Sequence, residues 1–142
     1  MSLLKNKVAI VTGGNGGIGL GIAEGLADQG ATIIIAARNE EKNKDAINKI
    51  KLLSKDSETF KLDVNDQDSI NNLMKFSTEK YGKIDILVNN AGISRRSDEP
   101  HLLSRNDWND VIDTNLNSIH HMTSAVFPYL KKNKSGKIIN IG

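Results

Sequence analysis

The sequence alternates between short, continuously apolar runs and longer segments in which apolar residues recur every three or four positions. Continuous runs of about four to eight apolar residues are typical of strands buried on both faces, whereas the longer spacing indicates amphipathic helices. Strands are therefore expected over residues 7–12, 32–37, 58–64, 84–92 and 137–141, the fourth running into a loop. Helices are expected over residues 17–30, 39–53, 65–82 and 105–132.

Individual residues support the predicted helices. Ile18, Ile22 and Leu26 are spaced four apart in the first helix, and Gly30 is a typical C-terminal stop. Asn39 is a typical N-cap for the second helix, because its side chain accepts a hydrogen bond from a free backbone N–H. That helix carries an apolar face at Ala46, Ile47, Ile50 and Leu53. The last helix carries an apolar series at Trp108, Val111, Ile112, Leu116, Ile119, Met122 and Val126.

The alternation of five strands with four helices predicts the fold class. Strands that are apolar throughout indicate an α/β domain in which a parallel sheet is covered by helices on both faces. Right-handed crossovers make this a three-layer, Rossmann-type doubly wound sheet, with the expected strand order 3-2-1-4-5. The length of 142 residues fits one domain, 1–142. Ligands bind such sheets outside the carboxyl ends of the strands where the order reverses, here strands one and four.

Composition excludes several classes of function. The net charge of +2 comes from mixed charges without a basic run, which argues against nucleic-acid binding. The chain has no cysteine, which excludes disulfides and suits a cytoplasmic location. We expect neither a signal peptide nor a membrane span, since the apolar runs are short. No metal site is expected, because His120 and His121 are adjacent and point about 100° apart on a helix.

The segment TGGNGGIG, residues 12–19, joins the first strand to the first helix. It holds Gly-x-Gly-x-x-Gly and a wider glycine pattern, which allow a tight turn and let a pyrophosphate approach the backbone N–H groups at a helix start. The alternative is a glycine-rich turn without ligand, but the flanking strand and helix favour a dinucleotide site. The expected cofactor-binding residues here are Thr12, Gly13, Asn15, Gly17, Ile18 and Gly19.

The end of the second strand indicates which dinucleotide binds. NAD sites usually carry Asp or Glu at this position, where the carboxylate binds the ribose hydroxyls. Here the chain has Ala37 followed by Arg38, so no carboxylate repels a 2′-phosphate and a guanidinium is available to pair with one. NADP is therefore the expected cofactor, with NAD as the second choice. The alternative for Arg38 is a solvated residue near the start of the next helix.

Further motifs follow in order along the chain. They are Asp63-Val64, Asn89-Asn90-Ala91-Gly92 and Asn115. Together with the glycine loop, these motifs resemble the short-chain dehydrogenase/reductase family over the whole chain. The resemblance implies an NAD(P)-dependent oxidoreductase that moves a hydride between nicotinamide and a secondary alcohol or ketone. It places Asp63 and Val64 at the adenine.

The same resemblance assigns roles to the later motifs. It implies that Asn89, Ala91 and Gly92 stabilise the fourth strand and border the cofactor ribose. It also implies that Asn115 is the catalytic asparagine, which holds a water in the proton relay. From the residues alone, Asn115 interrupts an apolar series and is expected to be a buried amide that needs hydrogen-bond partners. A purely structural hydrogen bond is the alternative role for this side chain.

The resemblance also implies catalytic residues beyond Gly142. The family places a serine directly after the fifth strand and a Tyr-x-x-x-Lys pair farther on. In this chain, four positions after Tyr81 and Tyr129 stand Asp85 and Asn133, so neither tyrosine fits. We therefore expect the cofactor half of a longer protein, inactive by itself. When intact, the protein is expected to be a homo-oligomer, a dimer or a tetramer.

Two arginines follow the fourth strand and suggest a substrate. Arg95 and Arg96 leave that strand at the ligand edge, where they are expected to meet a carboxylate, although a solvated arginine pair is the alternative. The surrounding residues look most like the gluconate and deoxygluconate dehydrogenases, so a sugar acid is the favoured small-molecule substrate. The main rival is a 3-oxoacyl thioester. From other classes, a non-catalytic dinucleotide-binding module and a regulatory sensor also stay open.

Overall fold

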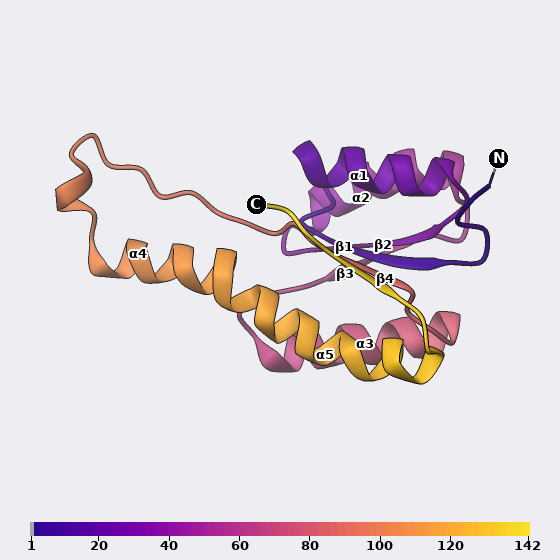
Figure 1. Ribbon diagram of the computed structural model, residues 1–142. Helices are drawn as coiled ribbons and strands as arrows, with labels where there is room; N and C mark the ends of the chain where they lie inside the picture. Colours follow the sequence, from indigo (N-terminus) through magenta and orange to yellow (C-terminus); the bar gives the residue numbers. More distant parts are fainter. Residues whose placement is uncertain (1) are drawn as a thin grey trace.

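The computed structural model describes residues 2–142 and has a five-stranded sheet between two layers of helices (Figure 1). The strands are β1 (Val8–Thr12), β2 (Thr32–Ala37), β3 (Glu58–Lys61), β4 (Ile86–Asn89) and β5 (Lys137–Asn140). The helices are α1 (Gly17–Asp28), α2 (Glu40–Leu53), α3 (Gln67–Tyr81), α4 (Arg105–Ile112) and α5 (Ser118–Asn133). A 3-10 turn, η1 (Pro100–Leu102), precedes α4, and a π turn, η2 (Asp113–Asn117), lies between α4 and α5.

The sheet has the order β3-β2-β1-β4-β5, and every pairing is parallel, as expected from the sequence. Helices α1 and α2 cover one face, while α3 and α5 cover the other (Figure 1). Because the strands are parallel, their carboxyl ends meet at one edge. In the register, Thr12 of β1 lies beside Ala36 of β2, and Val11 lies beside Val88 of β4. This edge carries the candidate site.

Helix α1 packs on the sheet through small residues. Its buried residues are Gly19, Ala23 and Ala27, whereas the side chain of Ile18 is 70% exposed at the first turn. Small residues on the inner face allow the helix axis to lie close to β1. The Asn39 cap of α2 is confirmed, because its side chain accepts a hydrogen bond from the Lys42 N–H at 3.0 Å.

The apolar face expected for α2 is only partly correct. Ala46, Ile47 and Ile50 are buried against the sheet. Leu53, the last residue of the helix, is 49% exposed, because the chain turns into an extended conformation at Ser54 and leaves this side chain only partly covered. Periodicity alone therefore places three of the four side chains correctly.

The long helix expected over residues 105–132 is interrupted, and this prediction was wrong. The N–H of Ser118 donates to the carbonyl of Asp113, five residues earlier, which defines the π turn. The carbonyl of Thr114 thereby loses its usual backbone partner, and the Ser118 hydroxyl donates to it instead at 2.5 Å. Side chains near the turn thus replace the hydrogen bond that regular helix geometry would have made.

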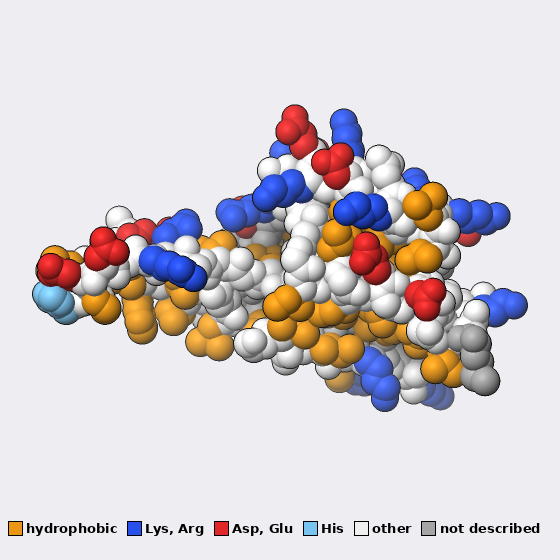
Figure 2. Space-filling view, turned by 90° about the horizontal axis from the view of Figure 1, so that it is seen from above, with side chains coloured by type: hydrophobic (Ala, Val, Ile, Leu, Met, Phe, Trp, Pro, Cys, Tyr) orange, Lys and Arg blue, Asp and Glu red, His pale blue; other side chains and the backbone are white. Residues whose placement is uncertain are grey.

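Residues 93–112, called the arm from here on, extend away from the sheet (Figure 1). Trp108 on the arm is 58% exposed, and Leu116 in the following π turn is 60% exposed. Figure 2 shows hydrophobic side chains gathered along one side of this extension and charged side chains along the other. Within residues 2–142, no helix combines the length and the hydrophobicity needed to cross a membrane.

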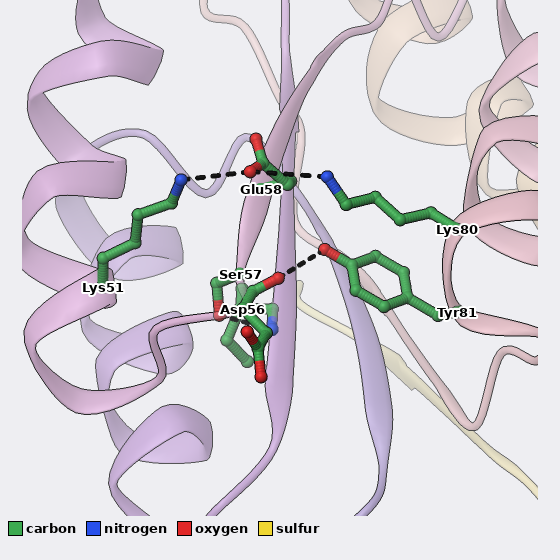
Figure 3. A network of polar contacts seen from close by, with 7 residues as sticks. Lys51, Asp56, Ser57, Glu58, Lys80 and Tyr81 are labelled. Carbon is green, nitrogen blue, oxygen red and sulfur yellow. Dashed lines mark hydrogen bonds and ion pairs between the residues drawn. The ribbon is translucent and has the colours of Figure 1, made fainter.

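A polar network fixes the start of β3, at the edge opposite the carboxyl ends (Figure 3). Glu58 is 3.0 Å from the Lys51 ammonium and 3.4 Å from that of Lys80. Partial burial opposes ionisation of Glu58, but the two lysines outweigh it, and its pKa is lowered. The Tyr81 hydroxyl donates to the carbonyl of Asp56 at 2.6 Å, and burial, with the nearby carboxylates, raises the pKa of Tyr81 to about 12. The network joins the ends of α2 and α3 to one edge strand.

Candidate functional site

A cavity of about 290 Å³ opens at the carboxyl ends of the central strands. Seven of the residues that the sequence assigns to the cofactor line it: Gly13, Asn15, Arg38, Asp63, Val64, Ala91 and Gly92. The other lining residues were not assigned to a site: Ala36, Ala37, Asn39, Lys42, Leu62, Asn65, Ile93 and Thr114. Thr12, Gly17, Ile18, Gly19 and Asn89 are expected cofactor residues that do not line this cavity.

The glycine loop contains three positions that only glycine fits well. Gly13 and Gly17 have φ angles of +62° and +53°, in the left-handed region that side chains rarely adopt. At Gly19, a Cβ atom would overlap the carbonyl oxygen of Gly13 and the side-chain amide of Asn90. The loop is therefore folded tightly against the start of α1, with little room for any side chain on its inner side.

The start of α1 presents free backbone donors beside the loop. Gly16 is the N-cap, with no side-chain hydrogen bond to the first turn. A Cβ atom at Gly16 or Gly17 would meet nothing within 4 Å, so the backbone there is open to approach. The N–H groups of a first helical turn lack intrahelical partners and favour a negatively charged ligand. Together with the cavity, this arrangement is suited to a pyrophosphate.

Thr12 joins the loops that follow β1 and β4. Its hydroxyl donates to the carbonyl of Val88 at 3.3 Å and accepts hydrogen bonds from the N–H groups of Asn90 and Ala91, both at 2.9 Å. The side-chain amide of Asn90 in turn donates to the carbonyls of Thr12 and Gly13, at 3.2 and 3.3 Å. Thr12 thus acts on the site by holding two cavity walls together, and Asn90, to which the sequence analysis gave no role, completes the connection.

Asn15 is fixed by a chain of amide hydrogen bonds. Its side chain donates to Asn43 Oδ1 at 2.9 Å, and Asn43 Nδ2 donates to the carbonyl of Ala37 at 3.0 Å. The glycine loop is thereby tied to the end of β2. Asn43 was not among the predicted site residues, although a signal was present, because it is a polar residue on the otherwise apolar face of α2 with Ala46 and Ile47.

The cavity is positively charged at the end of β2. Arg38 and Lys42 both line it there, and among the lining residues the only carboxylate belongs to Asp63, after β3. That carboxylate accepts a hydrogen bond from the Asn65 N–H at 2.9 Å, and the Asp63 N–H donates to the Ser69 hydroxyl at 3.0 Å. The two cations follow β2, whereas the carboxylate follows the neighbouring strand β3.

Asn89 connects strands and lies outside the cavity. Its side-chain amide donates to Asn140 Oδ1 at 2.9 Å and, more weakly, to the Thr123 hydroxyl at 3.4 Å. It is buried in β4 and ties that strand to β5 and α5. Its contacts in this structure are with neighbouring elements of the fold.

Asn115 is exposed, so the expectation of a buried amide was wrong. The π turn shifts the helical register, and Thr114 and Ser118 take the buried positions instead. Both polar atoms of the Asn115 amide still have a partner, because its Nδ2 donates to the carbonyl of Ile93 and its Oδ1 accepts from the N–H of Ile93, both at 2.8 Å. Asn115 therefore holds the chain that leaves β4, and Ile93 lines the cavity.

The two arginines expected to bind substrate do not line the cavity. The Arg95 guanidinium lies 3.6 Å from Asp107 and 3.7 Å from Asp110, both on α4, and so ties the two sides of the arm together. Arg96 is exposed and makes no ion pair with another residue in the range 2–142. Over the same range, no group of three or more His, Cys, Asp and Glu side chains is arranged to hold a metal ion.

Comparisons with known proteins agree on the family. The family model described as short chain dehydrogenase matches residues 7–142. The chain is 44% identical over 141 residues to a 3-oxoacyl-(acyl-carrier-protein) reductase of Chlamydia muridarum, covering 99% of this chain and 56% of that protein. It is 42% identical over 142 residues to a reductase of the same name from Vibrio harveyi, covering 98% of this chain and 55% of that protein.

Solved structures show the same fold. A crystal structure of NAD⁺-bound xylitol dehydrogenase is 27% identical, has a TM-score of 0.93, and is matched over 97% of this chain and 53% of that one. The chain thus spans about half the length of the relatives that it matches. Because the family model matches nearly all 142 residues and the fold agrees, the chain belongs to the short chain dehydrogenase family.

Proposed function

We propose that these residues form the cofactor-binding part of an NADPH-dependent reductase of 3-oxoacyl thioesters. The observation that carries this proposal is the relatives at 44% and 42% identity, both named 3-oxoacyl-(acyl-carrier-protein) reductase. These names favour the 3-oxoacyl thioester, the rival substrate in the sequence analysis, over the sugar acid. The structure adds that Arg95, one of the two arginines behind the sugar-acid hypothesis, is engaged by Asp107 and Asp110.

The cavity fits a phosphorylated dinucleotide. The glycine loop and the open start of α1 suit the pyrophosphate, and Arg38 and Lys42 supply two cations where a 2′-phosphate would lie. Directly after β2, where an NAD site usually carries a carboxylate for the ribose hydroxyls, the chain has Arg38, and the lining carboxylate Asp63 follows β3. When bound, the nicotinamide supplies the hydride. NADP is therefore the proposed cofactor, and Lys42 joins Arg38 as a proposed binding residue.

The other residues assigned to the site bind and orient the cofactor. In this proposal, Asp63 and Val64 hold the adenine side, while Ala91 and Gly92 border the ribose on the opposite wall. Asn115 fixes the Ile93 backbone at the mouth of the cavity and takes part in the proton relay. The acid that protonates the developing alkoxide is proposed to come from a Tyr-x-x-x-Lys pair outside these 142 residues.

Cofactor affinity tests the first part of the proposal. We expect the chain to bind NADPH more tightly than NADH, measured by the fluorescence of the reduced nicotinamide. Arg38→Ala is expected to weaken NADPH binding about tenfold, the effect of one charge-assisted hydrogen bond, and to change NADH binding less than about twofold. Lys44→Ala is a matched control, because Lys44 is an exposed lysine of α2 outside this cavity. Equal affinity for both dinucleotides would contradict the proposed cofactor.

Turnover by the full-length protein tests the substrate. We expect a 3-oxobutanoyl thioester with NADPH to give a much larger kcat/KM than gluconate with NADP. The Arg96→Ala variant serves as the second arm, because the sugar-acid alternative requires an arginine that meets a carboxylate. A preference for gluconate that Arg96→Ala abolishes would overturn the thioester assignment in favour of the sugar acid.

A further inference from the structure

Two segments of the cavity wall that are far apart in sequence are joined by a single side-chain hydrogen bond. Asn65, in the loop after β3, donates from Nδ2 to the Thr114 hydroxyl at 3.0 Å. Thr114 lies in the π turn, and both residues line the cavity. Neither residue was predicted from the sequence to belong to the site. The bond is the contact through which the wall after β3 reaches the turn that carries Asn115.

Thr114 is well placed to transmit a displacement. Its side chain is only 6% exposed, so the hydroxyl has little access to water. Its carbonyl is held by the Ser118 hydroxyl, and the π turn closes around it through the bond from the Ser118 N–H to Asp113. Asn115 is the next residue in the same hydrogen-bonded turn. A change in the position of Thr114 is therefore expected to move Asn115 as well.

Asn115 links the π turn to a second residue of the cavity wall, Ile93. Its amide exchanges two 2.8 Å hydrogen bonds with the backbone of Ile93, which lines the opposite side of the opening. The path thus begins at Asn65 on the cavity wall, passes through Thr114 and Asn115, and ends at Ile93 on the cavity wall. A ligand that fills the cavity contacts both ends of this path.

We propose that Asn65 and Thr114 are positioning residues for Asn115, and that filling the cavity tightens the contact between Asn115 and Ile93. This inference rests on the proposed function, in which a dinucleotide occupies the cavity. The physical reason is solvation. Asn65 is exposed, so water competes for its amide in the empty cavity, and a ligand that excludes this water strengthens the bond to Thr114.

Hydrogen exchange of the Ile93 amide reports the contact directly, because that N–H donates to Asn115 Oδ1. Thr114→Val removes the hydroxyl while keeping the shape of the side chain, and Thr114→Ser keeps the hydroxyl. Without ligand, Thr114→Val is expected to speed exchange at Ile93 roughly fivefold, the factor that corresponds to one net hydrogen bond, and Thr114→Ser to restore the slow rate. The Ala91 amide, held by Thr12, is the internal reference.

Three further measurements separate the possible outcomes. Thr78→Val on α3, which also removes a hydroxyl inside a helix, is expected to leave Ile93 unchanged. Asn65→Ala and the double variant with Thr114→Val are expected to give the same increase as Thr114→Val alone, because both changes remove one bond. Adding NADPH is expected to slow exchange at Ile93 in the wild type and much less in Thr114→Val.

The results distinguish this inference from the proposed function. If Ile93 exchanges equally in Thr114→Val and in the wild type without ligand, the positioning role is wrong, whatever the cofactor does. If NADPH binds, as judged by nicotinamide fluorescence, yet leaves Ile93 unchanged in the wild type, the coupling is wrong and the proposed function stands. If NADPH does not bind while the ligand-free differences appear, the positioning role stands and the proposed cofactor is wrong.

Discussion

Replacing Gly19 by alanine tests whether the glycine loop is as tightly folded as the structure indicates. The added Cβ atom would overlap the Gly13 carbonyl oxygen and the Asn90 side-chain amide, and one of those two groups belongs to the backbone. Neither can retreat freely, since the Asn90 amide itself donates to the carbonyls of Thr12 and Gly13. The substitution is therefore expected to push the loop after β1 away from the loop after β4.

Gly21→Ala is the matched control on the same helix. A Cβ atom at Gly21 would meet nothing within 4 Å, so only helix propensity changes, and the free energy of unfolding is expected to rise by about 0.5–1 kcal/mol. Gly19→Ala gains the same propensity but adds an overpacking cost of about 1–3 kcal/mol. The two variants are therefore expected to differ by about 2 kcal/mol, with Gly19→Ala the less stable.

Urea unfolding followed by circular dichroism measures this difference. With a slope of about 1–3 kcal/mol per molar urea, the two midpoints are expected to be separated by roughly 1 M. Gly19→Ala is also expected to weaken NADPH binding, because the loop that faces the pyrophosphate moves, whereas Gly21→Ala leaves it unchanged. Coincident midpoints for the two variants would refute the tight packing of the glycine loop against Asn90.

Two other predictions concern the contacts that frame the site. Thr12→Val is expected to lower the free energy of unfolding by about 2–3 kcal/mol, measured by urea unfolding, because the N–H groups of Asn90 and Ala91 lose their acceptor, and Thr12→Ser should recover most of the loss. Stability is expected to fall as the pH rises from about 10 to about 12, because the unfolded chain releases the Tyr81 proton near its ordinary pKa of 10.0, whereas the folded chain holds it to about 12. Tyr81→Phe should remove this part of the pH dependence, and an unchanged slope of the urea midpoint against pH would contradict the raised pKa.

The layered fold was predictable because its signals are local. Continuous apolar runs such as Ile33–Ile35 identify buried strands, and the N-cap at Asn39 and the left-handed Gly82 bound two helices where the sequence placed their ends. The expected strand order followed from the handedness of the crossovers, which leaves few alternatives. The cofactor edge was found for the same reason, since the carboxyl ends of parallel strands meet there.

The interruption at Asp113–Asn117 was not predictable from local pattern. Apolar spacing in this region fits an uninterrupted helix, and the π turn depends on a side chain, Ser118, that replaces one backbone bond. It depends as well on the contact between Asn115 and Ile93, which are 22 residues apart. Lys42 and Asn65 were missed for a related reason, because single polar residues in loops and on exposed faces carry no pattern that points into a cavity.

The engagement of Arg95 by α4 had a signal that the sequence analysis did not use. Asp107 and Asp110 are three residues apart and therefore lie on one face of a helix, where both reach the same guanidinium. Two acidic residues at this spacing, just after an arginine-bearing loop, compete with any substrate carboxylate for that arginine. Arg96 has no such pair of partners in its own vicinity, which is why the substrate test uses it.

The position of β1 in the middle of the sheet has a consequence for how the protein is made. β1 is synthesised before the other four strands of this sheet, yet its neighbour β4 begins only at Ile86. At about 5–20 residues per second, synthesis from the end of β2 to the end of β4 takes about 3–10 s, during which β2 is available on one side of β1 but the side that pairs with β4 has no partner. During this interval Val8–Thr12 offers an unpaired, apolar strand edge to other chains. Slower synthesis or lower temperature lengthens this exposure, so the yield of folded protein from a heterologous host should depend on the speed of translation between residues 38 and 89.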